Sequence, residues 1–187
     1  TGPAWLLWHG GWRKGEHLKH GPTQNEKPTV HRLITSGPVP WCMAISDIAE
    51  AVAAGQTYII AEIGQNHQGD MVIAKQLIDT AADAGVNAIK SQKRHTRTLL
   101  TPDQYDRPYD SPNAFADTYG AHRDALELSV EQHMELKAHA EGCGVAYFVS
   151  AWDPVSAAQM AEAGIPMFKI ASASITDEET VLSLIHI

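Results

Sequence analysis

Residues 58–70, YIIAEIGQNHQGD, join an apolar run to a polar turn. The first four residues are typical of a buried strand. That strand ends in the carboxylate of Glu62, and the turn after it holds Asn66 and His67. An acid at the end of an apolar strand indicates either an ion pair within a structural domain or a position in an active site.

Apolar strands and amphipathic helices alternate after this stretch. Asp70 is placed to cap a helix that Gly85 ends, and SVEQ (129–132) is a capping box for a second helix. A long polar segment, residues 93–128, lies between the second strand and that helix. The expected strands cover residues 58–63, 87–92, 145–152 and 167–172, and the expected helices begin near residues 70, 129, 153 and 176.

This order predicts an α/β fold in which helices cover a parallel sheet. The two candidates are an open doubly wound sheet and a (β/α)8 TIM-type barrel. No GxGxxG motif follows the first strand, and polar residues recur at the strand ends, so the pattern favours the barrel. A complete barrel needs about 250 residues. The chain is therefore expected to hold roughly the first four β/α units.

Composition narrows the class of protein. With 187 residues, 44% of them hydrophobic, one domain is expected. A net charge of −8 argues against nucleic acid as a partner. No apolar run approaches the roughly 20 residues of a membrane span, and the first residues lack the features of a signal peptide. Two cysteines make neither a disulfide framework nor a metal cluster, and a cytoplasmic protein is expected.

Residues 1–42 differ from the rest of the chain. They carry a net charge of +3 against −11 for residues 43–187, and they contain four of the five tryptophans and five of the ten prolines. We interpret them as a leader outside the domain, translated upstream of a natural start at Met43, with a disordered arm as the alternative. The last residues, LSLIHI, suggest a truncated end. The domain is expected to span residues 43–187.

Polar side chains gather at the expected strand ends. Lys90 and Gln92 share one face of the second strand because side chains alternate along it. Lys169 and Ser172 end the fourth strand. Two lysines at matching strand ends predict a shared anionic ligand, a phosphate or a carboxylate. Glu62 then serves as a counter-ion or as a general base.

Each of these residues also has a purely structural interpretation. A single lysine at a strand end is commonly solvated, and Glu62 can pair with Lys90 without catalysis. His67 fits a loop histidine bonded to the backbone, and Asp153 a helix cap. The SQKRHTR segment (91–97) is either a solvated basic loop or an anion-binding lid. The spacing alone supports an anion-binding half-barrel.

Four linked motifs add a family resemblance over residues 57–180. AEIGQNHQGD (61–70) and AIKSQKR (88–94) resemble the opening of the N-acetylneuraminate (sialic acid) synthase family. YFVSAWDP (147–154) and FKIASASITDEE (168–179) resemble its third and fourth strands, in the same order and at similar spacing. LTPDQYDRPYDSPNAF (100–115) is similar to a loop of one branch of the family.

The resemblance implies a (β/α)8 barrel that condenses phosphoenolpyruvate with an N-acylated amino sugar of the N-acetylmannosamine type. The product is a nine-carbon 2-keto-3-deoxy acid, and phosphate is released. Glu62 matches the acid near the reacting centre. The other matched positions are Lys90, Lys169 and Ser172 for phosphoenolpyruvate, and Gln92, Asn66 and His67 for further substrate contacts.

A divalent metal, Mn²⁺ or Mg²⁺, is implied as the group that polarises the sugar aldehyde. Its two histidine ligands in the family belong to later strands, so no metal ligand is expected in this chain. A homodimer is implied for the full-length enzyme. Ala151 and the pair Ala173-Ser174 depart from the common pattern and leave the acceptor sugar open. The alternatives are a related phosphoenolpyruvate aldol-type 3-deoxy sugar acid synthase and an inactive anion-binding fragment.

Overall fold

The computed structural model describes residues 47–187. The chain divides into two units, Thr1–Pro38 and Val39–Ile187, and the described residues all belong to the second. The predictions for residues 1–42 and for Met43 lie outside the described residues. None of the helices within residues 47–187 has the length and the hydropathy that a membrane span requires.

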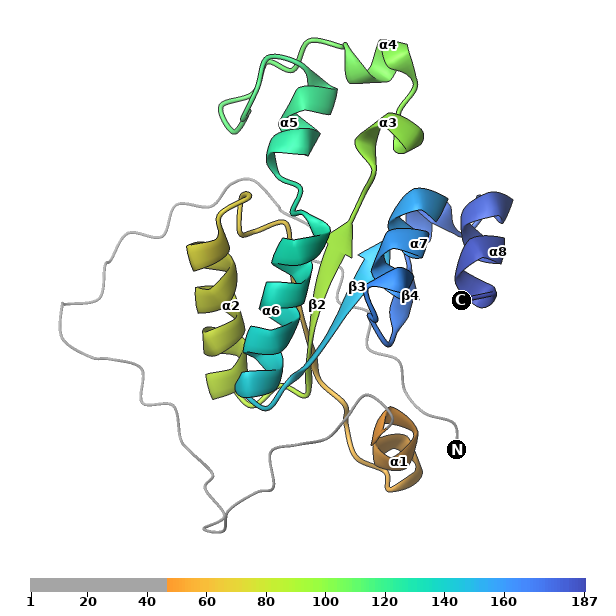
Figure 1. The fold of residues 1–187 in the computed structure, drawn as a ribbon. Helices are drawn as coiled ribbons and strands as arrows, with labels where there is room; N and C mark the ends of the chain where they lie inside the picture. The colour runs from red at the N-terminus through yellow and green to blue at the C-terminus, as the bar shows by residue number, and fades with distance from the viewer. Residues whose placement is uncertain (1–46) are drawn as a thin grey trace, which may run out of the picture. The chain divides into compact units, whose positions relative to one another are not determined.

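Four parallel strands form one sheet in the order β1-β2-β3-β4 (Figure 1). The strands are β1 (Ile60–Gly64), β2 (Ala88–Lys93), β3 (Ala146–Ala151) and β4 (Phe168–Ile170). The predicted alternation of strands and helices is therefore confirmed. β4 is shorter than the predicted strand because its ladder pairs only with Val149, Ser150 and Ala151, and the chain then turns into a 3₁₀ helix.

Helices connect the strands, and three short helices also lie within the polar segment. They are α1 (Asp47–Ala53), α2 (Met71–Asp83), α3 (Thr96–Leu99), α4 (Pro102–Tyr105), α5 (Tyr119–Ala125), α6 (Val130–Gly142), α7 (Pro154–Glu162), η1 (Ser172–Ser174) and α8 (Glu178–Ile185). The predicted caps are present. Asp70 accepts from two amides at the start of α2, Ser129 and Gln132 form a capping box, and Asp153 caps α7.

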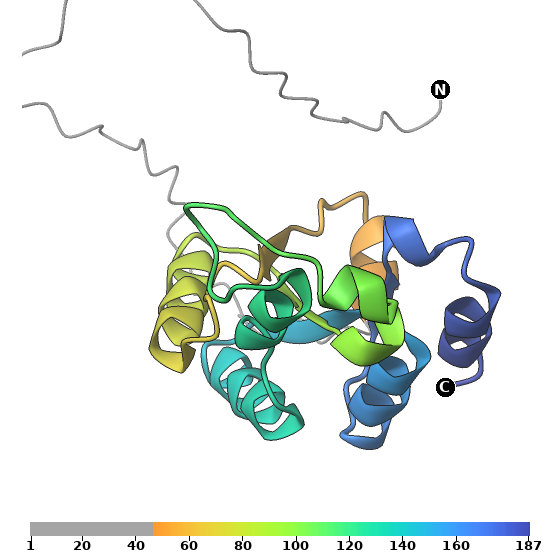
Figure 2. The same cartoon turned by 90° about the horizontal axis from the view of Figure 1, so that it is seen from above.

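One face of the sheet carries the main helices. Figure 2 shows α2, α6, α7 and α8 in an arc along that side of the strands, and these helices contact β1, β3 and β4. A doubly wound sheet instead reverses its strand order and has helices on both faces. Sequential order with a one-sided helical layer is the arrangement found in a (β/α)8 barrel. Closure into a complete barrel remains a prediction.

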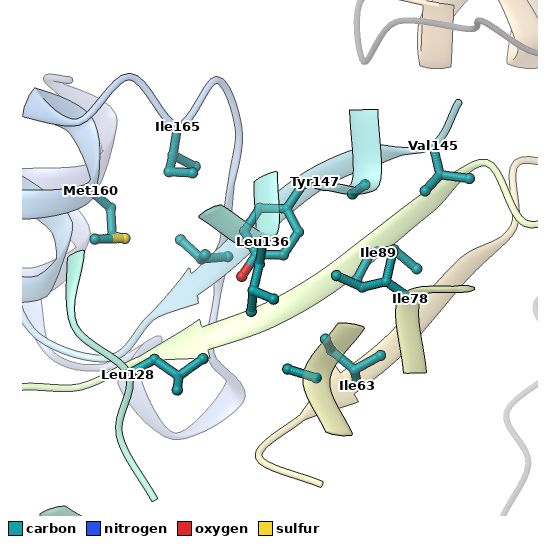
Figure 3. Packing of buried hydrophobic residues seen from close by; sticks show 12 residues of the cluster. Ile63, Ile78, Ile89, Leu128, Leu136, Val145, Tyr147, Met160 and Ile165 are labelled. Atoms are coloured by element: carbon teal, nitrogen blue, oxygen red, sulfur yellow. The ribbon is translucent and has the colours of Figure 1, made fainter. Parts of the chain in front are cut away.

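The core lies between the sheet and these helices (Figure 3). Ile89 and Tyr147 project from the two central strands, and Ile78 and Leu136 meet them from α2 and α6; all four are at most 1% exposed. Each fully buried aliphatic side chain contributes about 1.5–3 kcal/mol by its removal from water. This packing fixes which face of each strand is apolar. The alternate residues of the strands therefore point to the face without these helices.

The polar segment between β2 and α6 is more ordered than its composition predicts. It contains α3, α4 and α5, two of which have caps that are visible in the sequence. Thr101 and Gln104 form a capping box at α4, and Thr118 caps α5. Each of these helices has at most seven residues, so apolar periodicity gives little signal for them.

Candidate active site

The register of the sheet brings four of the predicted strand-end residues together with Ser150. Glu62 on β1 lies beside Lys90 on β2. One step further along, Gln92, Ser150 and Lys169 lie in one row across β2, β3 and β4. Because side chains alternate, all five residues belong to the face opposite the core. The prediction that Lys90 and Gln92 share a face agrees with this register.

Lys90 is a buried cation with one largely solvated partner. Its side chain is 7% exposed, and its Nζ lies 3.3 Å from Glu62 Oε1, whose side chain is 66% exposed. The same Nζ donates a hydrogen bond to Ser150 Oγ at 3.2 Å. Burial lowers the pKa of Lys90, the nearby Glu62 carboxylate opposes that change, and the charge of Lys169 adds to it. An anionic ligand on this face would stabilise the charged form of Lys90.

Lys169 lies on the neighbouring strand β4, and Ser172 follows the end of that strand. Lys169 is half-buried on β4, and Ser172 is exposed at the first position of η1. The turn is tied to the end of β3, because Ser174 Oγ donates to the Trp152 carbonyl at 3.1 Å. Lys169 thus lies in the row that contains Ser150, and Ser172 lies just beyond the carboxyl end of β4.

A polar network caps the carboxyl end of β2. Arg94 donates to Gln92 Oε1 at 3.2 Å and to Gln65 Oε1 at 2.5 Å. Its guanidinium lies 4.3 Å from the centroid of the Trp152 ring. Arg94 is only 9% exposed, so the interpretation of this segment as a solvated basic loop is wrong for this residue. Arg94 instead fixes the amide of Gln92 beside the cluster around Lys90.

Glu127 is the acid of this network, and sequence reasoning did not single it out. Its side chain is 10% exposed, and its carboxylate lies 3.7 Å from Arg94 and 3.9 Å from Lys93. It also accepts from the backbone amide of Arg94 at 3.0 Å and from Gln65 Nε2 at 2.5 Å. Burial raises the pKa of Glu127 to about 7, although the two cations oppose the shift. Glu127 lies more than thirty residues after Arg94, so no local pattern marks it.

The turn after β1 is held by His67. This ring is 1% exposed, and its Nδ1 accepts a hydrogen bond from the Gly69 amide at 3.0 Å. Burial lowers the pKa of His67. Gly69 has φ +79°, and a Cβ there would lie 2.5 Å from the Ala125 carbonyl oxygen, so glycine is required. The loop-histidine interpretation fits this geometry, whereas substrate contacts by His67 and the exposed Asn66 remain predictions.

A cavity of about 120 Å³ adjoins this network. Arg94 and Arg123 line it together with Trp152, and Leu99 and Leu100 form its apolar wall. Trp152 Nε1 is buried there without a hydrogen-bond partner among the described residues. A buried donor without a partner costs about 1–3 kcal/mol.

The carboxyl-end cluster does not by itself form a metal site. Glu62 is a single carboxylate beside two lysines, and cations of like charge disfavour a divalent ion. Within residues 47–187, the one group of three metal-capable side chains is Asp79, His139 and Cys143, which lies on α2 and α6. The described residues therefore do not fit the implied catalytic metal, and no chemical step is derived through it.

The sequence and the structure both resemble known synthases. Residues 77–186 match the model of the NeuB family. The chain is 38% identical to N-acetylneuraminate-9-phosphate synthase of Mus musculus over 115 residues, which is 62% of this chain and 32% of that protein. It is 35% identical to N,N'-diacetyllegionaminic acid synthase of Campylobacter jejuni over 123 residues, 65% of this chain and 37% of that protein. The chain thus spans about a third of the length of the curated relatives it matches.

A solved structure supports the fold. The N-acetylneuraminic acid (sialic acid) synthetase of Leptospira borgpetersenii, crystallised with citrate, superposes with a TM-score of 0.54 at 27% identity. The superposition covers 67% of this chain and 40% of that one. The strands of this chain follow the order β1-β2-β3-β4, without the reversal of a doubly wound sheet. Because the family model matches more than half of the residues, this chain belongs to the NeuB family.

Proposed function

We propose that the open face of the sheet binds phosphoenolpyruvate for a sialic acid synthase-type condensation. The observation that carries the proposal is the cluster of Lys90, which donates to Ser150, with Lys169, which lies beside Ser150 on the next strand. A buried ammonium whose carboxylate partner is mostly in water lacks full compensation for its lost hydration. A compact polyanion supplies that compensation, and two fixed cations also stabilise the charge that develops as phosphate leaves.

In the proposed reaction, the methylene carbon of phosphoenolpyruvate bonds to the aldehyde carbon of an open-chain N-acylated amino sugar. Water adds at C2 of the phosphoenolpyruvate unit, and inorganic phosphate leaves. Lys90, Lys169 and Ser172 hold the anionic groups, and Gln92 contacts the substrates at the next position along β2. Glu62 lies 3.3 Å from Lys90, at the border between the anion site and water. There it acts as the acid–base group next to the reacting carbons.

The further parts of the proposal concern the whole enzyme. A divalent metal, Mn²⁺ or Mg²⁺, is proposed for the complete enzyme, with ligands from outside the described residues. Residues 43–187 would form the first half of the barrel, and the complete enzyme would be a homodimer. Cys143 is a free thiol, which is in keeping with a reducing, cytoplasmic setting. Asn66 and His67 are proposed to shape the substrate side of the β1 turn.

Titration calorimetry with phosphoenolpyruvate tests the anion site in this chain. We expect Lys90→Ala and Lys169→Ala each to weaken binding by about tenfold or more, because each removes a charge-assisted contact. Lys137→Ala is the matched control, since Lys137 pairs with Glu141 on the outer helix α6. Unchanged affinity in both site variants would show that these lysines are ordinary strand-end residues.

A second experiment separates binding from chemistry, in a protein that carries these residues within a complete barrel. Glu62→Gln should lower the rate of phosphate release far more than it lowers affinity for phosphoenolpyruvate. Equal activity would make Glu62 a structural partner of Lys90. Turnover with arabinose or erythrose phosphates, but not with N-acetylmannosamine, would identify a related 3-deoxy sugar acid synthase. Binding without any turnover would identify an anion-binding module.

A further inference from the structure

The helices α2 and α6 carry two pairs of metal-capable side chains at one-turn spacing. Asp79 and Asp83 are four residues apart on α2, and His139 and Cys143 are four residues apart at the end of α6. Residues four apart lie on the same face of a helix. The two helices pack side by side, as Figures 1 and 2 both show. The two pairs therefore face each other across the helix–helix contact.

The ligand atoms already lie close together. Asp79 Oδ1 is 2.7 Å from His139 Nε2 and 3.5 Å from Cys143 Sγ, and all three atoms are within 4.8 Å of one another. Zinc–ligand bonds of about 2.0–2.3 Å place tetrahedral ligand atoms about 3.3–3.8 Å apart. The side chains need only small movements to reach these separations. Asp83 lines the same surface hollow beside Cys143 and Asp79.

The local charge also favours a cation. Both α2 and α6 end at this place, so the partial negative charges of two helix carboxyl termini add to the two aspartates. Burial raises the pKa of the Cys143 thiol, and the hydrogen bond to Asp79 and the charges of Asp79 and Asp83 raise it further. A bound divalent ion reverses this balance, because it displaces the thiol proton and binds the thiolate.

We propose that Asp79, His139 and Cys143 bind one zinc ion, with Asp83 or a water molecule as the fourth ligand. A sulfur, nitrogen and oxygen donor set suits Zn²⁺, whereas Mg²⁺ and Mn²⁺ prefer oxygen donors. The ion would link α2 to α6 and stabilise the helical layer. This site is separate from the candidate active site, because both helices end at the amino ends of the strands (Figure 1). In a (β/α)8 barrel that end serves stability and the other end serves chemistry.

Cobalt spectroscopy on the full 187-residue chain tests the site. The protein is stripped with a chelator and titrated with Co²⁺. We expect one ion per chain, a thiolate-to-cobalt charge-transfer band in the near ultraviolet, and loss of both signals when Zn²⁺ is added. Cys143→Ser should abolish the band, and His139→Gln should weaken binding by more than about tenfold. Cys42→Ser is the matched control and should change neither the charge-transfer band nor the affinity for Co²⁺.

Thermal unfolding gives an independent result. Zn²⁺ should raise the melting temperature of the unmodified chain, because it binds the folded state, and should not raise that of Cys143→Ser. Cys143 and Asp79 are both partly exposed, so the serine variant is expected to fold, which its melting temperature without metal will show. If no band and no shift appear, His139 and Asp79 form only an ion pair and the proposal is wrong. A band that survives in Cys143→Ser and disappears in Cys42→Ser would place the metal in residues 1–46 and also overturn it.

Discussion

Replacing Lys90 by methionine tests whether this lysine is kept for ligand binding rather than for stability. The ammonium is buried, and burial of an ion costs several kcal/mol even after the protein relaxes. At 3.3 Å the attraction of Glu62 contributes about 1.3 kcal/mol if the effective dielectric constant is that of water. Water around the Glu62 side chain, which is 66% exposed, screens this attraction.

Two further contributions to the stability of the charged Lys90, from Ser150 and from Lys169, have opposite signs. The hydrogen bond to Ser150 contributes about 1.5 kcal/mol, and repulsion from Lys169 opposes it. Methionine has a similar volume and needs no hydration, but it leaves the Ser150 hydroxyl without this donor. We therefore expect Lys90→Met to raise the free energy of unfolding by about 1–2 kcal/mol, within the range known for such replacements. The melting temperature should rise by about 3–8 °C.

Thermal unfolding with and without phosphoenolpyruvate measures both effects. The unmodified chain should gain stability from the ligand, and Lys90→Met should gain less at the same ligand concentration. Lys75→Met is the control, because Lys75 forms an exposed pair with Glu135 and should change stability by less than about 1 kcal/mol. If Lys90→Met is destabilised by more than about 1 kcal/mol, the pair with Glu62 is a structural ion pair. In that case Glu62 and Ser150 fully compensate the lost hydration of the Lys90 ammonium, and no ligand is needed to explain this lysine.

Two further predictions concern the scaffold. His133 is fully buried against Tyr147, and burial lowers its pKa to about 3. As the pH falls below 6.5, the unfolded chain therefore takes up a proton before the folded chain does, and the free energy of unfolding should fall by about 2 kcal/mol at pH 5. Urea unfolding at pH 6.5 and pH 5 measures this loss, and His133→Gln should remove it. Equal losses in both proteins would contradict the prediction. A Cβ at Gly120 would lie 2.0 Å from the Tyr105 ring, so Gly120→Ala should cost about 1–3 kcal/mol. Gly142→Ala, with open space around it, should be neutral or stabilising, and a stabilised Gly120→Ala would show that Tyr105 moves aside.

The site was predictable to the extent that its residues belong to regular strands. Lys90 and Gln92 share a face because alternation along a strand is fixed, and Glu62 meets Lys90 because parallel strands align their carboxyl ends. Glu127 could not be found in this way. It approaches Arg94 from a segment whose path depends on the packing of α5 and α6, and sequence separation hides such contacts.

The cluster of Asp79, His139 and Cys143 is a second example of a long-range contact that no local sequence pattern reveals. A sequence with two cysteines gave no reason to expect a site, yet the spacing of His139 and Cys143 on α6 was visible in it. What was missing is the partner helix. Asp79 lies sixty residues before His139, and only the docking of α2 on α6 brings the two atoms to 2.7 Å.

The local elements, the parallel α/β class and the residues at the strand ends can all be recognised in the amino-acid sequence. Helix caps act within four residues and strand alternation acts within two, so both can be recognised in a short stretch. The direction of the pKa shifts in the site and the partners of its side chains became apparent from the folded chain. Burial lowers the pKa of Lys90 and of Arg94, and burial raises the pKa of Glu127. Desolvation and long-range contact depend on the three-dimensional packing of distant segments, and no local sequence pattern specifies them.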